Sequence, residues 1–414
     1  SSALGYDGRP CNCVRNRQCF RFLRRRLLGR ILTCRTRSMK SPLALPIAII
    51  ALLIHGAHAQ TTKEGFLIPQ TNAELTFPRD HGSHPDFKIE WWYLTGHLFN
   101  ESKARYGFQA TFFRLAQRAP KANQEAVNFG ADQLYMAHMA IVDVSSKRYH
   151  HEERLNRSGW DASARSGDLG LRNGNWTLAR AEDDSITLSG SIRADAQINL
   201  TLTSNKPLVR FGKDGLSRKS ADATASSYYL TFTRLATTGT LRIDGKDHQV
   251  HGQAWMDHEI SSGQLSRDQI GWDWVSMQLN DGREIMAFIL RTATGEPDPF
   301  SCLTWITQEG DTIHVPQDGF TWDYQGDWTS PTSKATYPIA PIIRVSDPNT
   351  GKAVTYTLRP VMKEQELIGR LTGIAYWEGA CDVLNAKGDA IGQAYLELTG
   401  YAQGLTNYLG ADTK

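Results

Sequence analysis

The sequence predicts an all-β protein with two related antiparallel domains, built as barrels or sandwiches. Apolar and polar residues alternate with period two in many short segments, for example at 106–112, 186–188 and 198–202, which is typical of half-buried strands. Asn-Gly and Asp-Gly pairs recur between such segments and favour tight turns. Two sequence motifs, at 89–94 and 252–257, occur again in the same order at 270–275 and 392–397, which indicates two related domains. Residues 361–370 are the only stretch that predicts a helical turn or two.

The first 59 residues predict processing rather than folded structure. Residues 1–38 hold ten Arg and four of the six Cys, and we expect them to be an upstream extension. Residues 39–59 combine Lys40, an apolar run and an Ala-x-Ala end, which indicates a secretory signal peptide and a mature start at Gln60. A membrane anchor is the weaker alternative, because the apolar run is short. We therefore expect an exported bacterial protein, periplasmic or secreted, without a stable membrane anchor.

The rest of the chain argues against several function classes. Residues 60–414 carry 35 basic and 42 acidic residues, so we expect no nucleic-acid partner. Cys302 and Cys381 alone do not make a disulfide scaffold, although export would permit one bond. The chain has no Walker A, GxGxxG or GxSxG motif, so it predicts no cofactor and no α/β-hydrolase.

Two internal matches predict the domain organisation. Residues 89–94 (IEWWYL) match 270–275 (IGWDWV), and residues 252–257 (GQAWMD) match 392–397 (GQAYLE). An aromatic strand therefore opens each half, and a strand with an acidic residue near its end closes it. We predict a linker at 60–74, a first domain at 75–262, a second domain at 265–405 and a tail at 406–414.

The longest motifs are similar to those of a known family. The runs DHGSHPDFKIEWWYLTGHL, VHGQAWMDHEIS, GWDWVSMQLNDGREIMAFILR and YWEGACDV resemble the lipocalin-like AttH and carotenoid 1,2-hydratase (CrtC) superfamily, and within it the bacterial "predicted secreted hydrolase" subgroup. The resemblance covers about residues 65–405. It implies two consecutive lipocalin-like antiparallel β-barrels. It implies no single activity, because the superfamily includes a hydratase, pericyclase-like enzymes and members without an assigned reaction.

The strand that closes the first half supplies the candidate catalytic residues. Alternation places Trp255, Asp257 and Glu259 on one face and His258 on the other. An acid beside a large aromatic residue in a dry cavity can stay protonated near neutral pH and act as a general acid. The alternative is a structural acid that accepts hydrogen bonds or pairs with an Arg. The resemblance implies that Asp257 protonates a double bond, but Trp255 stands where hydratase members carry Tyr.

The repeated motifs also supply candidate ligand-binding residues. These are Trp91, Tyr93, Trp272, Trp274, Tyr395 and Glu397. They could line a cavity, or the aromatic residues could simply pack the barrel floor. Asp273 either faces solvent or pairs with one of two arginines that end corresponding strands, Arg114 and Arg291.

A weak metal-site pattern lies before the first repeated strand. His81, His84 and Asp86, followed by Glu90 and His97, have the residue types that bind zinc. The structural alternative is an extended loop in which the His and Asp side chains form hydrogen bonds to the backbone of turns.

Two functions fit these observations. The first is an exported protein that binds a hydrophobic, lipid or isoprenoid-like ligand and could serve an envelope transporter. The second is an enzyme that hydrates, isomerises or hydrolyses an apolar substrate, with Asp257 as general acid. A structural role in envelope assembly is a weaker third possibility.

Overall fold

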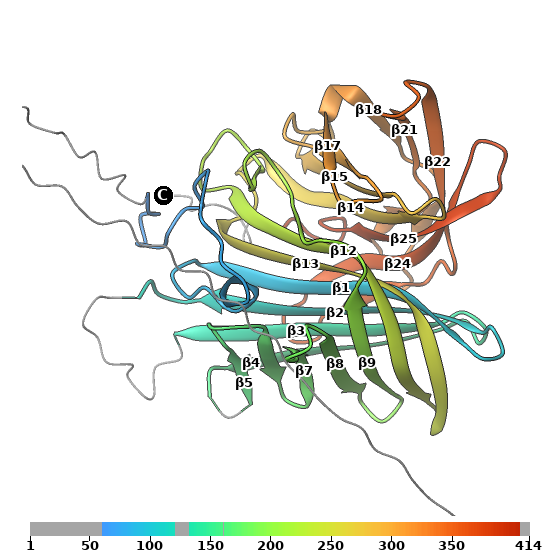
Figure 1. The fold of residues 1–414 in the computed structure, drawn as a ribbon, viewed down its shortest axis with the longest axis horizontal. Helices are drawn as coiled ribbons and strands as arrows, with labels where there is room; N and C mark the ends of the chain where they lie inside the picture. The colour runs from blue at the N-terminus through green and yellow to red at the C-terminus, as the bar shows by residue number, and fades with distance from the viewer. Residues whose placement is uncertain (1–59, 121–131, 160, 406–414) are drawn as a thin grey trace, which may run out of the picture. The chain divides into compact units, whose positions relative to one another are not determined.

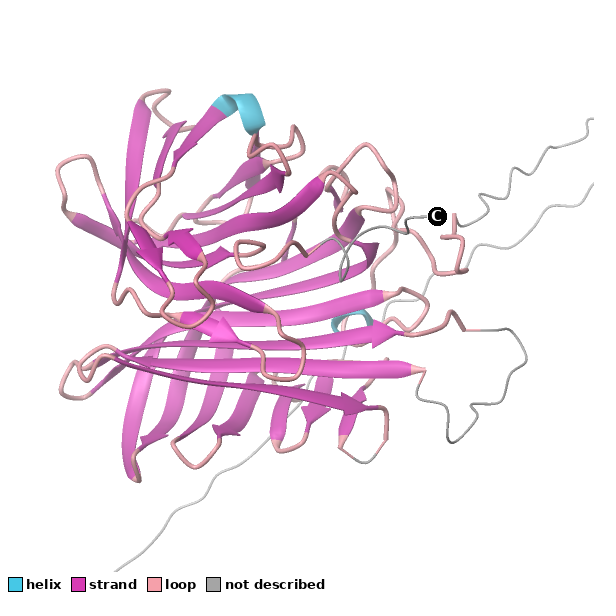
Figure 2. Cartoon of the chain, turned by 180° about the vertical axis from the view of Figure 1, so that it is seen from behind, coloured by secondary structure: helices cyan, strands magenta, loops and turns pink. Residues whose placement is uncertain are grey.

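The computed structural model describes residues 60–120, 132–159 and 161–405 (Figure 1). The predicted extension at 1–38, the signal peptide at 39–59 and the tail at 406–414 lie outside these residues. The described chain is almost entirely strand and turn (Figure 2), with two 3-10 turns at Arg79–His81 (η1) and Gln317–Gly319 (η2). None of the helices in these ranges is long and apolar enough to cross a membrane.

The first sheet has 13 antiparallel strands and curls into a nearly closed barrel. Its path runs β4-β3-β2-β1-β13-β12-β9-β8-β7-β6-β5, and β10 and β11 pair with β12. Asn173 of β6 bonds the side chain of Asn156 on β4 (2.6 Å) and the carbonyl of Tyr135 on β3 (3.2 Å), which joins the two ends of the path. The strands are β1 (Ile89–Asn100), β2 (Arg105–Ala116), β3 (Gln133–Asp143), β4 (Arg148–Arg157), β5 (Ala162–Ala164), β6 (Gly170–Asn173), β7 (Trp176–Arg180), β8 (Ile186–Ile192), β9 (Ala196–Ser204), β10 (Val209–Arg210), β11 (Leu216–Arg218), β12 (Ser226–Ile243) and β13 (Lys246–Gly263).

The second sheet has ten strands and forms the second barrel. Its path runs β17-β16-β15-β14-β25-β24-β22-β21-β18, β23 pairs with β24, and β19 and β20 form a separate hairpin. The strands are β14 (Gln269–Leu279), β15 (Glu284–Thr292), β16 (Cys302–Ile306), β17 (Thr312–Pro316), β18 (Phe320–Asp323), β19 (Asp327–Thr329), β20 (Thr336–Pro338), β21 (Ile342–Ser346), β22 (Ala353–Pro360), β23 (Glu366–Ile368), β24 (Ala375–Leu384) and β25 (Ala390–Leu398). The predicted fold class, two consecutive lipocalin-like antiparallel barrels, is confirmed.

The prediction of a helical turn at 361–370 is wrong. Residues Glu366–Ile368 form β23, which pairs with β24. Leu367 is fully buried, and the Glu366 carboxylate accepts a hydrogen bond from Tyr337 Oη (2.8 Å). These tertiary contacts outweigh the local helical preference of this charged stretch.

The opening and closing strands of each half lie side by side. β1 pairs with β13 and places Tyr93 opposite Asp257, and β14 pairs with β25 and places Trp274 opposite Glu397. The two matching sequence motifs therefore form the same pair of neighbouring strands in each half. Each half sets an aromatic residue beside an acid at the same point of its sheet.

The apolar residues divide into separate cores. One fills the first barrel and includes Ala254 and Met256; another fills the second barrel and includes Leu396. A third lies between the barrels, where Trp255 of β13 and Trp274 of β14 meet. Successive residues of β13 thus alternate between the barrel interior and the inter-barrel face.

Candidate functional site

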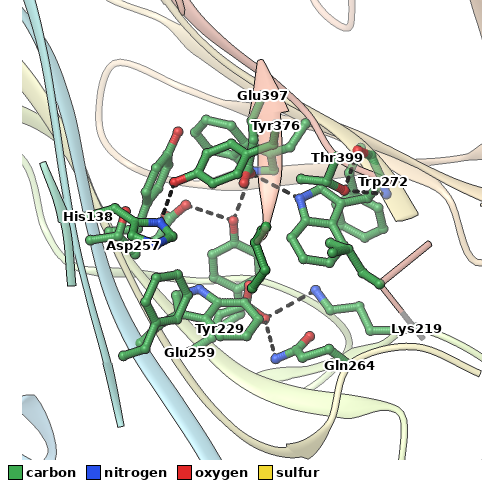
Figure 3. Close-up of a pocket in the computed structure, with 18 of the residues that line it drawn as sticks. His138, Lys219, Tyr229, Asp257, Glu259, Gln264, Trp272, Tyr376, Glu397 and Thr399 are labelled. Carbon is green, nitrogen blue, oxygen red and sulfur yellow. Dashed lines mark hydrogen bonds and ion pairs between the residues drawn. The ribbon is translucent and has the colours of Figure 1, made fainter. Parts of the chain in front are cut away.

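A cavity of about 100 Å³ lies between the two barrels, on the outer faces of both sheets (Figure 3). Most of its wall is aromatic or aliphatic: Trp91, Tyr93, Phe113, Met136, Tyr229, Trp272, Trp274, Phe288, Leu290, Ile374, Tyr376 and Leu405. Its polar lining is Thr111, His138, Lys219, Asp257, Glu259, Gln264, Glu397 and Thr399. Both halves of the repeat therefore contribute an acid to one largely apolar space.

Asp257 lines this cavity and is 2% exposed. Its carboxylate accepts hydrogen bonds from Tyr229 Oη (2.8 Å), Thr231 Oγ1 (2.6 Å) and Trp255 Nε1 (2.8 Å). Trp274 Nε1 donates to the Tyr229 oxygen (3.0 Å) and so directs the Tyr229 hydroxyl toward Asp257. Burial outweighs the hydrogen bonds and raises the pKa of Asp257 to about 7. Within the described ranges no basic side chain forms an ion pair with it.

Glu259 lies two residues further along the same face and, unlike Asp257, is paired with a cation. Lys219 Nζ lies 3.2 Å from its carboxylate, and Ser227 Oγ donates a short hydrogen bond to the same oxygen. The Lys219 ammonium also lies 4.7 Å from the ring centroids of both Tyr229 and Phe288, which adds cation–π attraction. Glu259 is therefore held in this wall by Lys219 and Ser227.

The second half contributes two buried carboxyl groups. Glu397 accepts a hydrogen bond from Trp272 Nε1 (3.0 Å), and burial raises its pKa to about 7. Glu378 lies opposite Glu397 in the β24–β25 register. Burial and the Glu397 charge raise the pKa of Glu378 well above its ordinary value. Of the two, Glu397 lines the cavity, and its raised pKa favours a protonated carboxyl there, as at Asp257.

The structure decides between the two alternatives for Asp273. Its side chain is fully buried, and Arg291 Nε lies 3.0 Å from its carboxylate. Arg114 instead pairs with Glu90, with 3.0 Å between Arg114 Nε and the carboxylate.

The predicted ligand-binding residues gather at this interface, but not all of them face the cavity. Trp91 stacks on Trp272 with ring centroids 6.4 Å apart, and both line the wall together with Tyr93, Trp274 and Glu397. Trp255 and Tyr395 belong to the inter-barrel core without lining the cavity. Trp255 acts on the site through its hydrogen bond to Asp257.

The predicted metal ligands do not converge as a set. Glu90 instead gathers His84 and His258: one carboxylate oxygen lies 2.8 Å from His84 Nδ1 and 2.9 Å from His258 Nε2. Their possible ligand atoms lie within 4.8 Å of one another. The Arg114 guanidinium contacts the other oxygen of Glu90, so the network already has a cation. The His81 ring instead lies beside Phe77, with ring centroids 4.5 Å apart and planes tilted by 39°. Asp86 is exposed, and His97 Nε2 lies 3.0 Å from the carbonyl oxygen of Ala394.

Several cavity residues carried no signal in the sequence. Lys219 and Tyr229 lie outside the repeated motifs, and His138 is a single His within an apolar strand. Tyr376 lies in the YWEGACDV motif, but its neighbours in the sequence indicate no polar partner. Strand pairing and the packing of the two barrels bring these residues together.

Comparisons with known proteins agree with this architecture. The sequence profile described as AttH-like matches residues 68–401. The crystal structure of a protein assigned as AttH from Nitrosomonas europaea is 33% identical, with a TM-score of 0.71, over 80% of this chain and 98% of that one. The structure of kievitone hydratase from Nectria haematococca is 14% identical, with a TM-score of 0.59, over 83% of this chain and 97% of that one. At this identity the similarity concerns the fold alone. No curated protein matches the chain.

Proposed function

Since the chain belongs to the AttH-like family, we propose that it is an acid–base enzyme that adds water to a carbon–carbon double bond of an apolar molecule. One observation carries the proposal: Asp257, a buried carboxyl with a pKa near 7, faces an aromatic cavity without a basic partner among the described residues. The hydratase activity in the name of the fold neighbour kievitone hydratase is compatible with this reaction.

The geometry gives each residue a role in this reaction. Protonated Asp257 donates its proton to one carbon of the double bond, and the aromatic walls around it stabilise the positive charge that develops on the other. Tyr229, Thr231 and Trp255 hold the carboxylate that remains. Water adds to the charged carbon and loses a proton, so the net change is the addition of one water.

The size of the cavity limits the substrate. About 100 Å³ is well below the roughly 300–1,000 Å³ of pockets that enclose drug-sized ligands. We therefore expect the cavity to hold the unsaturated end of an apolar chain, lipid or isoprenoid-like, while the remainder extends outward.

The apolar lining also favours a second candidate, a carrier for such a ligand. An exported carrier could deliver a lipid to an envelope transporter without changing it. This candidate requires binding but no proton transfer, so a variant that lacks only the Asp257 acid separates the two functions.

The experiment uses the mature protein, residues 60–414, with farnesol and oleate as probes in oxygen-18 water. Mass spectrometry measures the gain of one labelled water. We expect Asp257→Asn to reduce this gain by about 10²–10⁴-fold while the variant stays folded. Asp318→Asn, at an exposed turn, is the matched control.

The carrier function predicts another result. Both probes would then bind wild type and Asp257→Asn equally, and neither would gain water. Equal turnover by the two proteins would contradict the role of Asp257 as the acid.

A further inference from the structure

Three polar side chains, each in contact with the next, lead to the cavity from strands other than β13 and β25. Tyr376 Oη lies 2.7 Å from His138 Nδ1, and His138 Nε2 lies 3.4 Å from Glu153 Oε1. Tyr376 comes from β24 of the second barrel, and His138 and Glu153 come from β3 and β4 of the first. Figure 3 shows the Tyr376–His138 contact beside Glu397 and Asp257.

The Glu153 carboxylate is held as an anion. It accepts hydrogen bonds from the backbone N–H groups of Leu371 (2.6 Å) and Thr372 (3.3 Å), and a short one from Thr372 Oγ1. Burial raises the pKa of Glu153, but the hydrogen bonds from His138, Thr372 and Leu371 outweigh it and lower the pKa to about 2. Its side chain is only 2% exposed, so solvent competes little for it.

This anion sets the tautomer of His138. A carboxylate only accepts hydrogen bonds, so a neutral imidazole at this position carries its proton on Nε2. The lone pair on Nδ1 is then free to accept the proton of the Tyr376 hydroxyl. The order of groups is hydroxyl, imidazole and carboxylate, in which the carboxylate orients the base and the base acts on the hydroxyl.

The arrangement is placed to act on a bound molecule rather than only to join the barrels. Tyr376 and His138 both line the cavity, whereas Glu153 lies behind them. Burial raises the pKa of Tyr376 well above 10, so its hydroxyl keeps its proton until His138 accepts it. An inter-barrel link needs no particular tautomer and no hydroxyl at the cavity wall.

We propose that Tyr376, His138 and Glu153 form a proton relay in which the Tyr376 hydroxyl, activated by His138, takes a proton from a molecule bound in the inter-barrel cavity. The Tyr376 hydroxyl proton moves to His138 Nδ1 as the Tyr376 oxygen takes the proton of the bound molecule, so one proton is transferred in total. The resulting imidazolium is stabilised by Glu153. In the hydration proposed above, this molecule is the water that adds to the substrate; that assignment rests on the proposed function, whereas the activation of Tyr376 does not.

The test uses phenylmethanesulfonyl fluoride, a small apolar electrophile, on the mature protein. The Tyr376 oxygen forms a bond to sulfur, the sulfur–fluorine bond breaks, fluoride leaves and His138 takes the hydroxyl proton. Peptide mass spectrometry locates the sulfonyl group. We expect Tyr376 to be labelled faster than Tyr93 and Tyr229, which also line the cavity but have no His partner in the described chain.

Variants separate activation from simple access. We expect His138→Asn to slow the labelling of Tyr376 by about 10²-fold or more, the usual size of a lost general base. Glu153→Gln should slow it less, and neither should change the labelling of Lys219, which reports entry of the reagent. Equal labelling of Tyr376 in wild type and His138→Asn, or no labelling of any cavity residue, would overturn the relay.

A second measurement does not depend on the stability of these variants. Nitrogen-15 NMR of wild type labelled at histidine should show His138 as the Nε2–H tautomer, with an Nδ1 shift that changes in Tyr376→Phe. An Nδ1–H tautomer would overturn the relay. Either result is independent of whether farnesol or oleate is hydrated, so the two proposals fail separately.

Discussion

Tyr93 of the first barrel packs edge to face against Trp274 of the second, with ring centroids 5.2 Å apart and planes 83° apart. These two residues occupy the same position in the internal repeat. The next matching pair, Trp91 and Trp272, stacks nearly parallel beside them. The two halves therefore meet through equivalent residues, and the cavity forms where these pairs leave space.

The raised pKa of Asp257 makes the stability of the protein depend on pH. The carboxyl contributes stability that is complete below its unfolded pKa of 3.8 and is lost as pH rises through about 7. Asn at this position does not titrate. We expect urea unfolding to show Asp257→Asn gaining stability relative to wild type between about pH 4 and pH 8, on the order of a few kcal/mol. Parallel pH profiles for the two proteins would show that Asp257 titrates normally.

The same carboxyl predicts the pH dependence of turnover. A general acid must be protonated, so hydration of the probes should fall above about pH 7, by about tenfold for each further unit. Initial rates between pH 5 and 9 measure this limb. A rate that rises with pH would instead indicate a carboxylate acting as base.

The Glu90 network is expected to support the fold. Glu90 is fully buried and holds the buried Arg114 cation as well as His84 and His258. Replacing Glu90 by Gln leaves that cation without a counter-charge, so we expect a loss of about 3–5 kcal/mol in unfolding free energy. Asp86→Asn, in the same segment but exposed, is the control and should change stability little. An unchanged melting temperature for Glu90→Gln would exclude this role.

Cys302 and Cys381 are free thiols, and both are buried. Burial raises the pKa of the Cys302 thiol to about 12 and also raises that of Cys381, so neither forms thiolate readily. We predict that folded protein of residues 60–414 reacts very slowly with Ellman's reagent and that its two thiols react at once in denaturant. Rapid reaction of one thiol before unfolding would show local opening of a barrel.

The sequence predicted the fold well because the information is local. Strand alternation separated Asp257 and Trp255 from Met256, and the repeat identified the strands that pair in each half. The cavity could not be predicted in the same way, since His138 and Lys219 reach it through the packing of distant strands. The His84–Glu90–His258 network likewise depends on the β1–β13 register, which brings residues from both ends of the first domain together.

Contacts between equivalent residues are the mark of a two-fold axis, as in an isologous homodimer. This chain has that geometry within one polypeptide. In a true homodimer every substitution occurs on both sides of the axis, and the enclosed space stays symmetric. Covalent linkage removes this restriction. Asp257 corresponds to Glu397 and Glu259 corresponds to Thr399, so the two walls differ. A space with unlike walls distinguishes the two ends and the two faces of its guest, so the proposed hydration would act on its substrate in one direction and with one handedness.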